Sequence, residues 1–174
     1  MKIASPLGSK LAILAFVVAS VTALAPTAFA QIRTQTFALV PGIPGSSTDE
    51  HHAGWIEVAS LSQGLSTAKK GTACDVFLGK QLDIAGPRLW LAAVTGQTFG
   101  EIRIEVVKTG EMPLKFYEVR LQNARVTSIS TAGSSGGDFF ESVGLTGTSM
   151  TLSFYPQKPD GTLDTPVTTN IPCN

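Results

Sequence analysis

The sequence predicts a mainly β domain, a β-barrel or β-sandwich with a single appended helix. Turn-forming residues recur throughout the chain, which contains 17 glycines and 10 prolines. The segments between them are short, and several alternate apolar with polar side chains. Only one segment has the spacing of an amphipathic helix. About seven short strands with one helix are typical of barrels and sandwiches rather than of alternating α/β folds.

The clearest expected strand covers residues 101–106. Its apolar side chains, Ile102, Ile104 and Val106, alternate with charged ones. This period of two is expected where one face of a sheet is buried and the other is solvated. The other expected strands are residues 37–40, 55–61, 73–78, 114–121, 124–130 and 149–155.

The one expected helix covers residues 86–96. Pro87 suits the first helical position, where its missing N–H costs nothing, and Gly96 is a natural C-terminal stop. Loops are expected at residues 62–71 and 133–137, where small and polar residues cluster. The apolar stripe of the helix is expected to consist of Leu89, Trp90, Ala93 and Val94.

The first thirty residues have the order of a secretory signal peptide. Two lysines supply the positive charge, residues 11–24 form an apolar run, and Ala-Phe-Ala at 28–30 fits the small-x-small cleavage pattern. The run is shorter than the roughly 20 apolar residues of a membrane span, and an uncleaved N-terminal anchor is the alternative. Cleavage after Ala30 would leave one domain, residues 31–174, in the periplasm or outside the cell.

The charge balance argues against nucleic acid and anionic membranes as partners. The whole chain has 13 basic and 13 acidic residues. Because two lysines leave with the signal peptide, the remaining domain has 11 basic and 13 acidic residues, a formal net charge of −2. Such a domain has no basic field to attract nucleic acid. After the signal peptide, no second segment is long and apolar enough to span a membrane.

The two cysteines, Cys74 and Cys173, form an even pair in a chain that we expect to be exported. Such a pair first indicates a disulfide, because exported proteins fold in an oxidising compartment. The alternatives are a bond between subunits and two unpaired thiols, and the spacing does not decide among the three. Zinc is disfavoured because Cys74 belongs to no Cys-x-x-Cys or Cys-x-x-His arrangement.

No set of residues has the spacing of an active site, so we expect no enzyme activity, no cofactor and no metal. His51 and His52 are the only histidines. Adjacent residues on an extended segment point to opposite faces, which disfavours a metal site shared with Asp49. We expect His52 instead to cap or pair locally on a solvated loop. Ser46 and Ser47 lie too close to the histidines in sequence to identify a triad.

Several motifs are informative through their order along the chain. The first is Pro-Gly-Ile-Pro-Gly at 41–45, followed by a Ser/Asp cluster, His52 and a strand from Trp55. The second is the helix entry with Asp83, Pro87, Leu89 and Ala92, and the third is Gly-Gln-Thr-Phe at 96–99. The last consists of Gly136, Gly137, Asp138, Glu141, Leu152, Tyr155, Asp160 and Gly161. This order resembles the hemolysin-coregulated protein (Hcp) family, the tube subunits of type VI secretion systems. The resemblance covers nearly all of residues 36–163.

The resemblance implies a β-barrel of two sheets with one flanking α-helix. It also implies a homo-oligomer in which six copies form a ring, and in which stacked rings form a tube that carries secreted effector proteins. The segment Thr67, Lys69, Lys70 and Gly71 is expected to reach a neighbouring subunit, as the corresponding loop does in the family.

Three features depart from the family pattern. Ser46 stands where a glutamate is usual, residues 61–64 replace a Trp-Gly pair, and a signal peptide precedes the domain. Two hypotheses for the function follow. The chain is either a self-assembling ring subunit, or a monomeric periplasmic or secreted binding module that keeps the fold without forming a tube.

Overall fold

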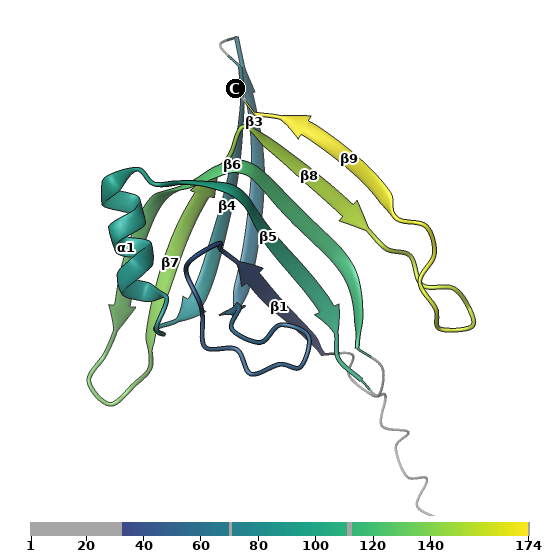
Figure 1. The fold of residues 1–174 in the computed structure, drawn as a ribbon, viewed down its shortest axis with the longest axis horizontal. Helices are drawn as coiled ribbons and strands as arrows, with labels where there is room; N and C mark the ends of the chain where they lie inside the picture. The colour runs from purple at the N-terminus through teal and green to yellow at the C-terminus, as the bar shows by residue number, and fades with distance from the viewer. Residues whose placement is uncertain (1–32, 70, 111–112, 174) are drawn as a thin grey trace, which may run out of the picture. The chain divides into compact units, whose positions relative to one another are not determined.

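The computed structural model describes residues 33–69, 71–110 and 113–173. The predicted signal peptide, residues 1–30, lies outside the described residues. Within them the chain forms nine strands and one helix, which confirms the prediction of a mainly β fold with a single helix (Figure 1). The elements are β1 (Thr34–Leu39), β2 (Ile56–Val58), β3 (Ser60–Ala68), β4 (Gly71–Gln81), α1 (Gly86–Thr95), β5 (Thr98–Lys108), β6 (Leu114–Gly133), β7 (Phe139–Thr146), β8 (Ser149–Phe154) and β9 (Val167–Pro172).

The strands close into a barrel. They pair in the order β2-β1-β5-β6-β7-β4-β3, and every pairing is antiparallel. The first and last strands of this path, β2 and β3, are consecutive in the sequence and separated only by Ala59. The Ala59 N–H donates to the carbonyl of Gly79 in β4 at 2.7 Å. One segment of chain therefore joins both ends of the path, as the barrel prediction requires.

The barrel has two sheets because its longest strand bends. The first part of β6 pairs with β8, and from Arg125 onward β6 pairs with β7. Between the two parts, Asn123 has a positive φ of 45°, a conformation that asparagine tolerates better than most residues. Gly147 lies between β7 and β8 at the same corner, where a Cβ atom would meet the Gln122 carbonyl at 2.7 Å. The two strands predicted at 114–121 and 124–130 are therefore one bent strand.

The core fills the space between the two sheets. Ile102 and Ile104 are fully buried, as the alternation of β5 predicts. A register shift between Val106 and Val107 then places Val107, rather than Val106, among the buried residues. The core cluster also contains Val76, Leu78, Val119, Leu121, Val126, Val143, Leu145 and Met150.

Helix α1 has the predicted ends and a different buried face. Gly96 is left-handed, with φ 65°, and the amides that follow the helix return to the carbonyls of Ala92 and Ala93. Leu89 and Ala92 are buried. Trp90 and Val94 are 46% and 82% exposed, so the predicted stripe was wrong at these two positions. The helix contacts the barrel through a narrower face, on which Gly86, Leu89 and Ala92 are buried.

One further prediction was wrong, and one strand was not predicted. Residues 62–71, expected to be a loop, form most of a hairpin in which β3 pairs with β4 from Ser60↔Gly79 to Ala68↔Gly71. The C-terminal segment forms β9, which pairs with β8 and was not expected. Both segments are polar and exposed along most of their length, so the burial pattern that identifies strands in a sequence is missing.

Candidate functional site

The β3–β4 hairpin extends beyond the barrel. From Val76 onward β4 pairs with β7, but nearer the tip β4 pairs only with β3 among the described residues. We call the described residues 64–69 and 71–75, the part without a third strand, the arm. Figure 1 shows the hairpin reaching past the other strands, with β9 ending beside its base. The arm is therefore the element best placed to touch another molecule.

The residues predicted to contact a neighbouring subunit lie at the tip of the arm. Thr67 and Lys69 are exposed. Gly71 begins β4 with φ 141°, a conformation that side chains rarely adopt. Lys70 lies outside the described residues. The described residues of the candidate contact segment therefore lie at the short turn between β3 and β4 and not in a long loop.

The two cysteines are joined in the structure. Cys74 in β4 and Cys173 after β9 form a disulfide, with their Cα atoms 5.6 Å apart. Both are buried. The bond lies at the base of the arm, and its formation in the exported protein remains a prediction.

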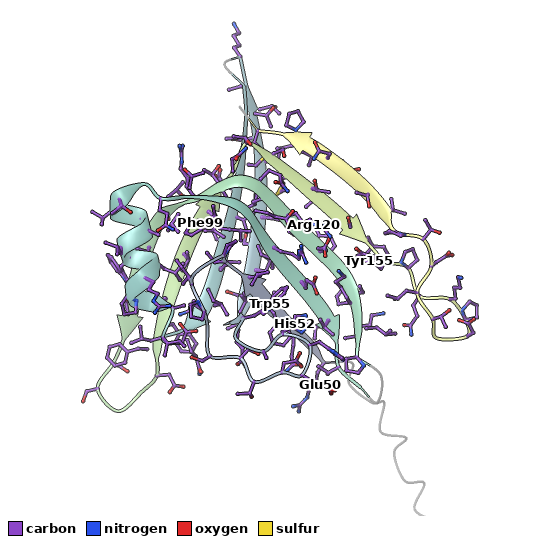
Figure 2. All side chains as sticks on the ribbon, viewed as in Figure 1. Glu50, His52, Trp55, Phe99, Arg120 and Tyr155 are labelled. Carbon is purple, nitrogen blue, oxygen red and sulfur yellow. A yellow bond between two sulfur atoms is a disulfide. The ribbon has the colours of Figure 1, made fainter. Side chains whose placement is uncertain are left out.

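His52 is buried at the centre of a cluster beside β1 and β5. Its ring stacks on Phe37 with centroids 4.2 Å apart, and meets the edge of Trp55 at 4.9 Å. Figure 2 shows His52 and Trp55 together at this end of the barrel. Nδ1 lies 2.7 Å from Asp49 Oδ1, and Nε2 lies 3.1 Å from Glu105 Oε2. The prediction that His52 pairs locally is confirmed, although the residue is buried rather than solvated.

The His52 cluster continues into a chain of ion pairs. Glu105 Oε1 accepts from Lys115 Nζ at 3.1 Å, and Lys115 Nζ also donates to Glu118 Oε2 at 2.6 Å. The other oxygen of Glu118 accepts from Arg120 Nε at 2.6 Å. Alternation places Glu118 and Arg120 on one face of β6, opposite Glu105 of β5, and the register shift that skips Phe116 brings Lys115 to the same face. The alternation of β5 predicts a solvated face here, and the ion pairs across it were not predicted.

These contacts shift the pKa of two carboxyls. The hydrogen bond from His52 lowers the pKa of Asp49 below its ordinary value. Burial alone would raise the pKa of Glu118, but the hydrogen bonds from Lys115 and Arg120 outweigh it and lower that pKa. Both carboxyls are thus held in their charged form.

Stability is therefore expected to fall in acid. Because both folded-state pKa values lie below the unfolded ones, this contribution is fully present above pH of about 4.5 and is lost as the pH falls through the folded values. Urea unfolding at pH steps between about 6 and 3 measures it. Glu118→Gln should flatten this profile, whereas Asp164→Asn, at an exposed carboxyl 3.9 Å from its lysine, should not. Equal acid sensitivity in Glu118→Gln and wild type would contradict the assignment.

A second ion cluster lies beneath the start of α1. Lys80 Nζ is 2.7 Å from both Glu141 Oε2 and Asp83 Oδ1, and it donates to the Gln81 carbonyl at 2.8 Å. Lys80 and Glu141 are almost completely buried. The Glu141 carboxylate lies so close to Gly86 that a Cβ there would meet it at 2.8 Å. Asp83 also accepts from the Ala85 N–H. The cluster joins β4, β7 and α1.

Neither cluster offers an open catalytic or metal site. Both ring nitrogens of His52 face carboxylates, and His51 is exposed. Ser47 is buried, with its Oγ accepting from the Asp49 N–H at 3.2 Å. Across residues 33–69, 71–110 and 113–173, no group of three metal-binding side chains comes together.

Exposed apolar side chains gather at and around α1. We call them the α1 patch. Leu82, Ile84 and Phe140 also line a cleft of about 600 Å³ between the end of β4 and the start of the helix. The patch consists of Leu82, Ile84, Trp90, Leu91, Val94, Phe139 and Phe140, each at least 46% exposed. Apolar surface of this kind marks sites where proteins associate.

Comparison with known proteins identifies the family. The model described as "Type VI secretion system effector, Hcp" matches residues 37–155. This chain belongs to the Hcp family. The resemblance in the order of its motifs is thereby confirmed, and with it the assignment to the tube and effector proteins of type VI secretion.

Individual Hcp proteins are similar over most of the chain. Protein hcp1 of Pseudomonas aeruginosa is 29% identical over 141 residues, which cover 74% of this chain and 87% of that protein. Hcp1 from Salmonella typhimurium shares the fold with a TM-score of 0.67 at 21% identity, over 80% of this chain and 94% of the other. A type VI secretion system effector from Yersinia pestis gives a TM-score of 0.66 at 22% identity, over 79% and 98%.

Hcp proteins are secreted by type VI secretion systems. Among the residues that the structure describes, no helix combines the length and the apolar character needed to cross a membrane.

Proposed function

We propose that this Hcp protein is a non-enzymatic ring subunit that works by binding copies of itself, six to a ring. Membership of the Hcp family carries the proposal. The exposed arm and the α1 patch support it, because a subunit needs two different surfaces to form a head-to-tail ring. Secreted effector proteins held by the ring are the proposed partners. Both clusters of titratable residues are engaged in internal contacts, which supports a role without catalysis.

The alternative is a monomeric binding module that keeps the fold. The predicted signal peptide favours it, because export before assembly would separate the chain from a cytoplasmic tube. Light scattering coupled to size-exclusion chromatography distinguishes the two on residues 31–174. A mass of about six subunits supports the ring. A single subunit at high concentration supports the module.

Deleting residues 67–71 is expected to shift the oligomer toward monomer while the barrel stays folded. The deletion removes the tip of the arm, which lies outside the core, so circular dichroism should still report a β domain. The control deletes Ser134 and Ser135 from the turn between β6 and β7, which leaves three residues to connect the two strands. Size-exclusion chromatography should show assembly retained in the control. Equal loss of assembly in both variants would contradict a specific role for the arm.

Export is expected to remove residues 1–30. The order of charge, apolar run and small-x-small site is that of a cleaved signal peptide. Intact-mass analysis of exported protein should therefore find a chain that begins at Gln31. Ala28→Arg should block cleavage while leaving targeting intact. A mature wild-type chain that retains residues 11–24 would refute this and support the membrane anchor.

A further inference from the structure

The disulfide lies at the point where the hairpin leaves the barrel. The pairing of β4 with β7 begins at Val76, and Cys74 is two residues nearer the tip. One further contact reaches Cys74 from the barrel, because Thr146 Oγ1 donates to its carbonyl at 2.8 Å. Beyond Cys74, the described part of β4 pairs with β3 alone. Cys74 therefore marks the root of the arm.

The other half of the bond comes from a different sheet. Cys173 directly follows β9, an edge strand that pairs with β8. The Cys173 N–H donates to the carbonyl of Thr148 at 2.9 Å, which fixes the end of the chain at the corner between β7 and β8. The bond thus ties the root of the arm to the corner where the two sheets separate.

Apart from the disulfide, few contacts fix the orientation of the arm relative to the barrel. The residues of β3 from Ser62 to the tip are exposed on both faces, and the largest apolar side chain among them, Leu65, is 51% exposed. Leu65 is the partner of Cys74 in the hairpin register. A two-stranded hairpin without a packed face is only marginally stable in water. Its orientation therefore depends on its root.

We propose that the Cys74–Cys173 disulfide is a brace that orders the arm, so that the arm is ready for subunit contacts only after oxidation. This inference rests on the proposed role of the arm in assembly. A braced arm loses less conformational freedom when it binds, which favours association. Reduction removes the covalent link between Cys173, after β9, and the arm. The arm can then swing about its root.

The chemistry of the brace links it to the compartment. Two thiols lose two protons and two electrons as the S–S bond forms, and a disulfide oxidant, such as an oxidised dithiol oxidoreductase, accepts them and becomes two thiols. Oxidising compartments supply such oxidants, whereas the cytosol keeps thiols reduced. Cys74 and Cys173 are 0% and 8% exposed. Once formed, the bond is therefore shielded from exchange, which needs access to a sulfur.

Hydrogen exchange measured by mass spectrometry on residues 31–174, at a dilution where the protein is monomeric, tests the brace directly. Three samples are compared: the oxidised wild type, the wild type reduced with a phosphine in urea and refolded with the phosphine present, and the variant Cys74→Ser/Cys173→Ser in the same buffer as the oxidised wild type. Amides of residues 62–75 should exchange at least about tenfold faster without the bond. Those of β5 should change by less than about twofold. Trypsin cleavage after Lys69 should accelerate in parallel.

The assembly readout is taken on the same three samples at high concentration. The brace predicts fewer rings in the reduced protein and in the double variant. Equal exchange of the arm with and without the bond overturns the brace, as does an acceleration spread evenly over all strands. Rings that form equally well with a loosened arm overturn its link to assembly. A wild type that is monomeric throughout refutes the ring proposal instead, while the exchange data still decide whether the brace exists.

Discussion

Replacing Lys80 with methionine is expected to destabilise the domain by about 3–5 kcal/mol, because breaking one side of a buried ion pair leaves an uncompensated charge. Lys80 donates to Glu141 and to the Gln81 carbonyl, and it forms an ion pair with Asp83. Its methylene stem is also fully buried. Methionine fills a similar volume without the charge, so the expected loss is electrostatic rather than a cavity effect. Urea unfolding followed by circular dichroism measures it.

The control for this variant is Lys158→Met. Lys158 is 45% exposed and lies 3.9 Å from its carboxylate partner, so its removal should change stability by less than about 0.5 kcal/mol. A second variant tests the cause. Adding Glu141→Leu to Lys80→Met removes the stranded carboxylate and should recover most of the loss. If Lys80→Met is as stable as Lys158→Met, the cluster does not hold α1 to the barrel as the structure indicates.

The strands and the helix that face the core could be predicted, because burial leaves a pattern in the sequence. Ile102 and Ile104 alternate with charged residues, and Pro87 and Gly96 bound the helix. The arm could not be predicted as strand, since Ser, Gly and Thr dominate residues 62–68 and no face is buried. The bend of β6 at Asn123 was likewise taken as a gap between two strands. In each case the structure is fixed by strand pairing, which single-sequence patterns do not record.

Some parts of the candidate site could likewise be predicted from the sequence, and others could not. The contact segment at the arm tip was predicted from the family resemblance, and a disulfide was indicated by the even number of cysteines and the expected export, with an intersubunit bond and free thiols as the alternatives. The ion clusters were missed because their members lie far apart in the sequence. Lys80 and Glu141 are separated by 61 positions, and His52 and Glu105 by 53. A charged residue in an otherwise apolar strand, such as Lys80 after Val76 and Leu78, is the signal that could have pointed to a buried pair.

Replacing His52 with alanine is expected to cost about 2–4 kcal/mol, from two lost hydrogen bonds and a lost aromatic stack. Both ring nitrogens lie within hydrogen-bond distance of carboxylates. Without the ring, Phe37 loses its stacked partner and the loop that carries Asp49 loses its attachment to β5. His52→Gln keeps one donor and should show an intermediate loss. Urea unfolding at neutral pH measures all three proteins.

The neighbouring residue provides the matched control for this prediction. His51 is exposed, and the contact that the structure gives it is from its backbone N–H to Asp49 Oδ1 at 3.0 Å, which alanine can also make. His51→Ala should therefore stay within about 0.5 kcal/mol of the wild type. The two variants remove the same side chain one position apart, so a large difference between them isolates the buried contacts of His52. Equal, small losses in both would show that the His52 cluster adds little to the fold and that the loop is held by its backbone alone.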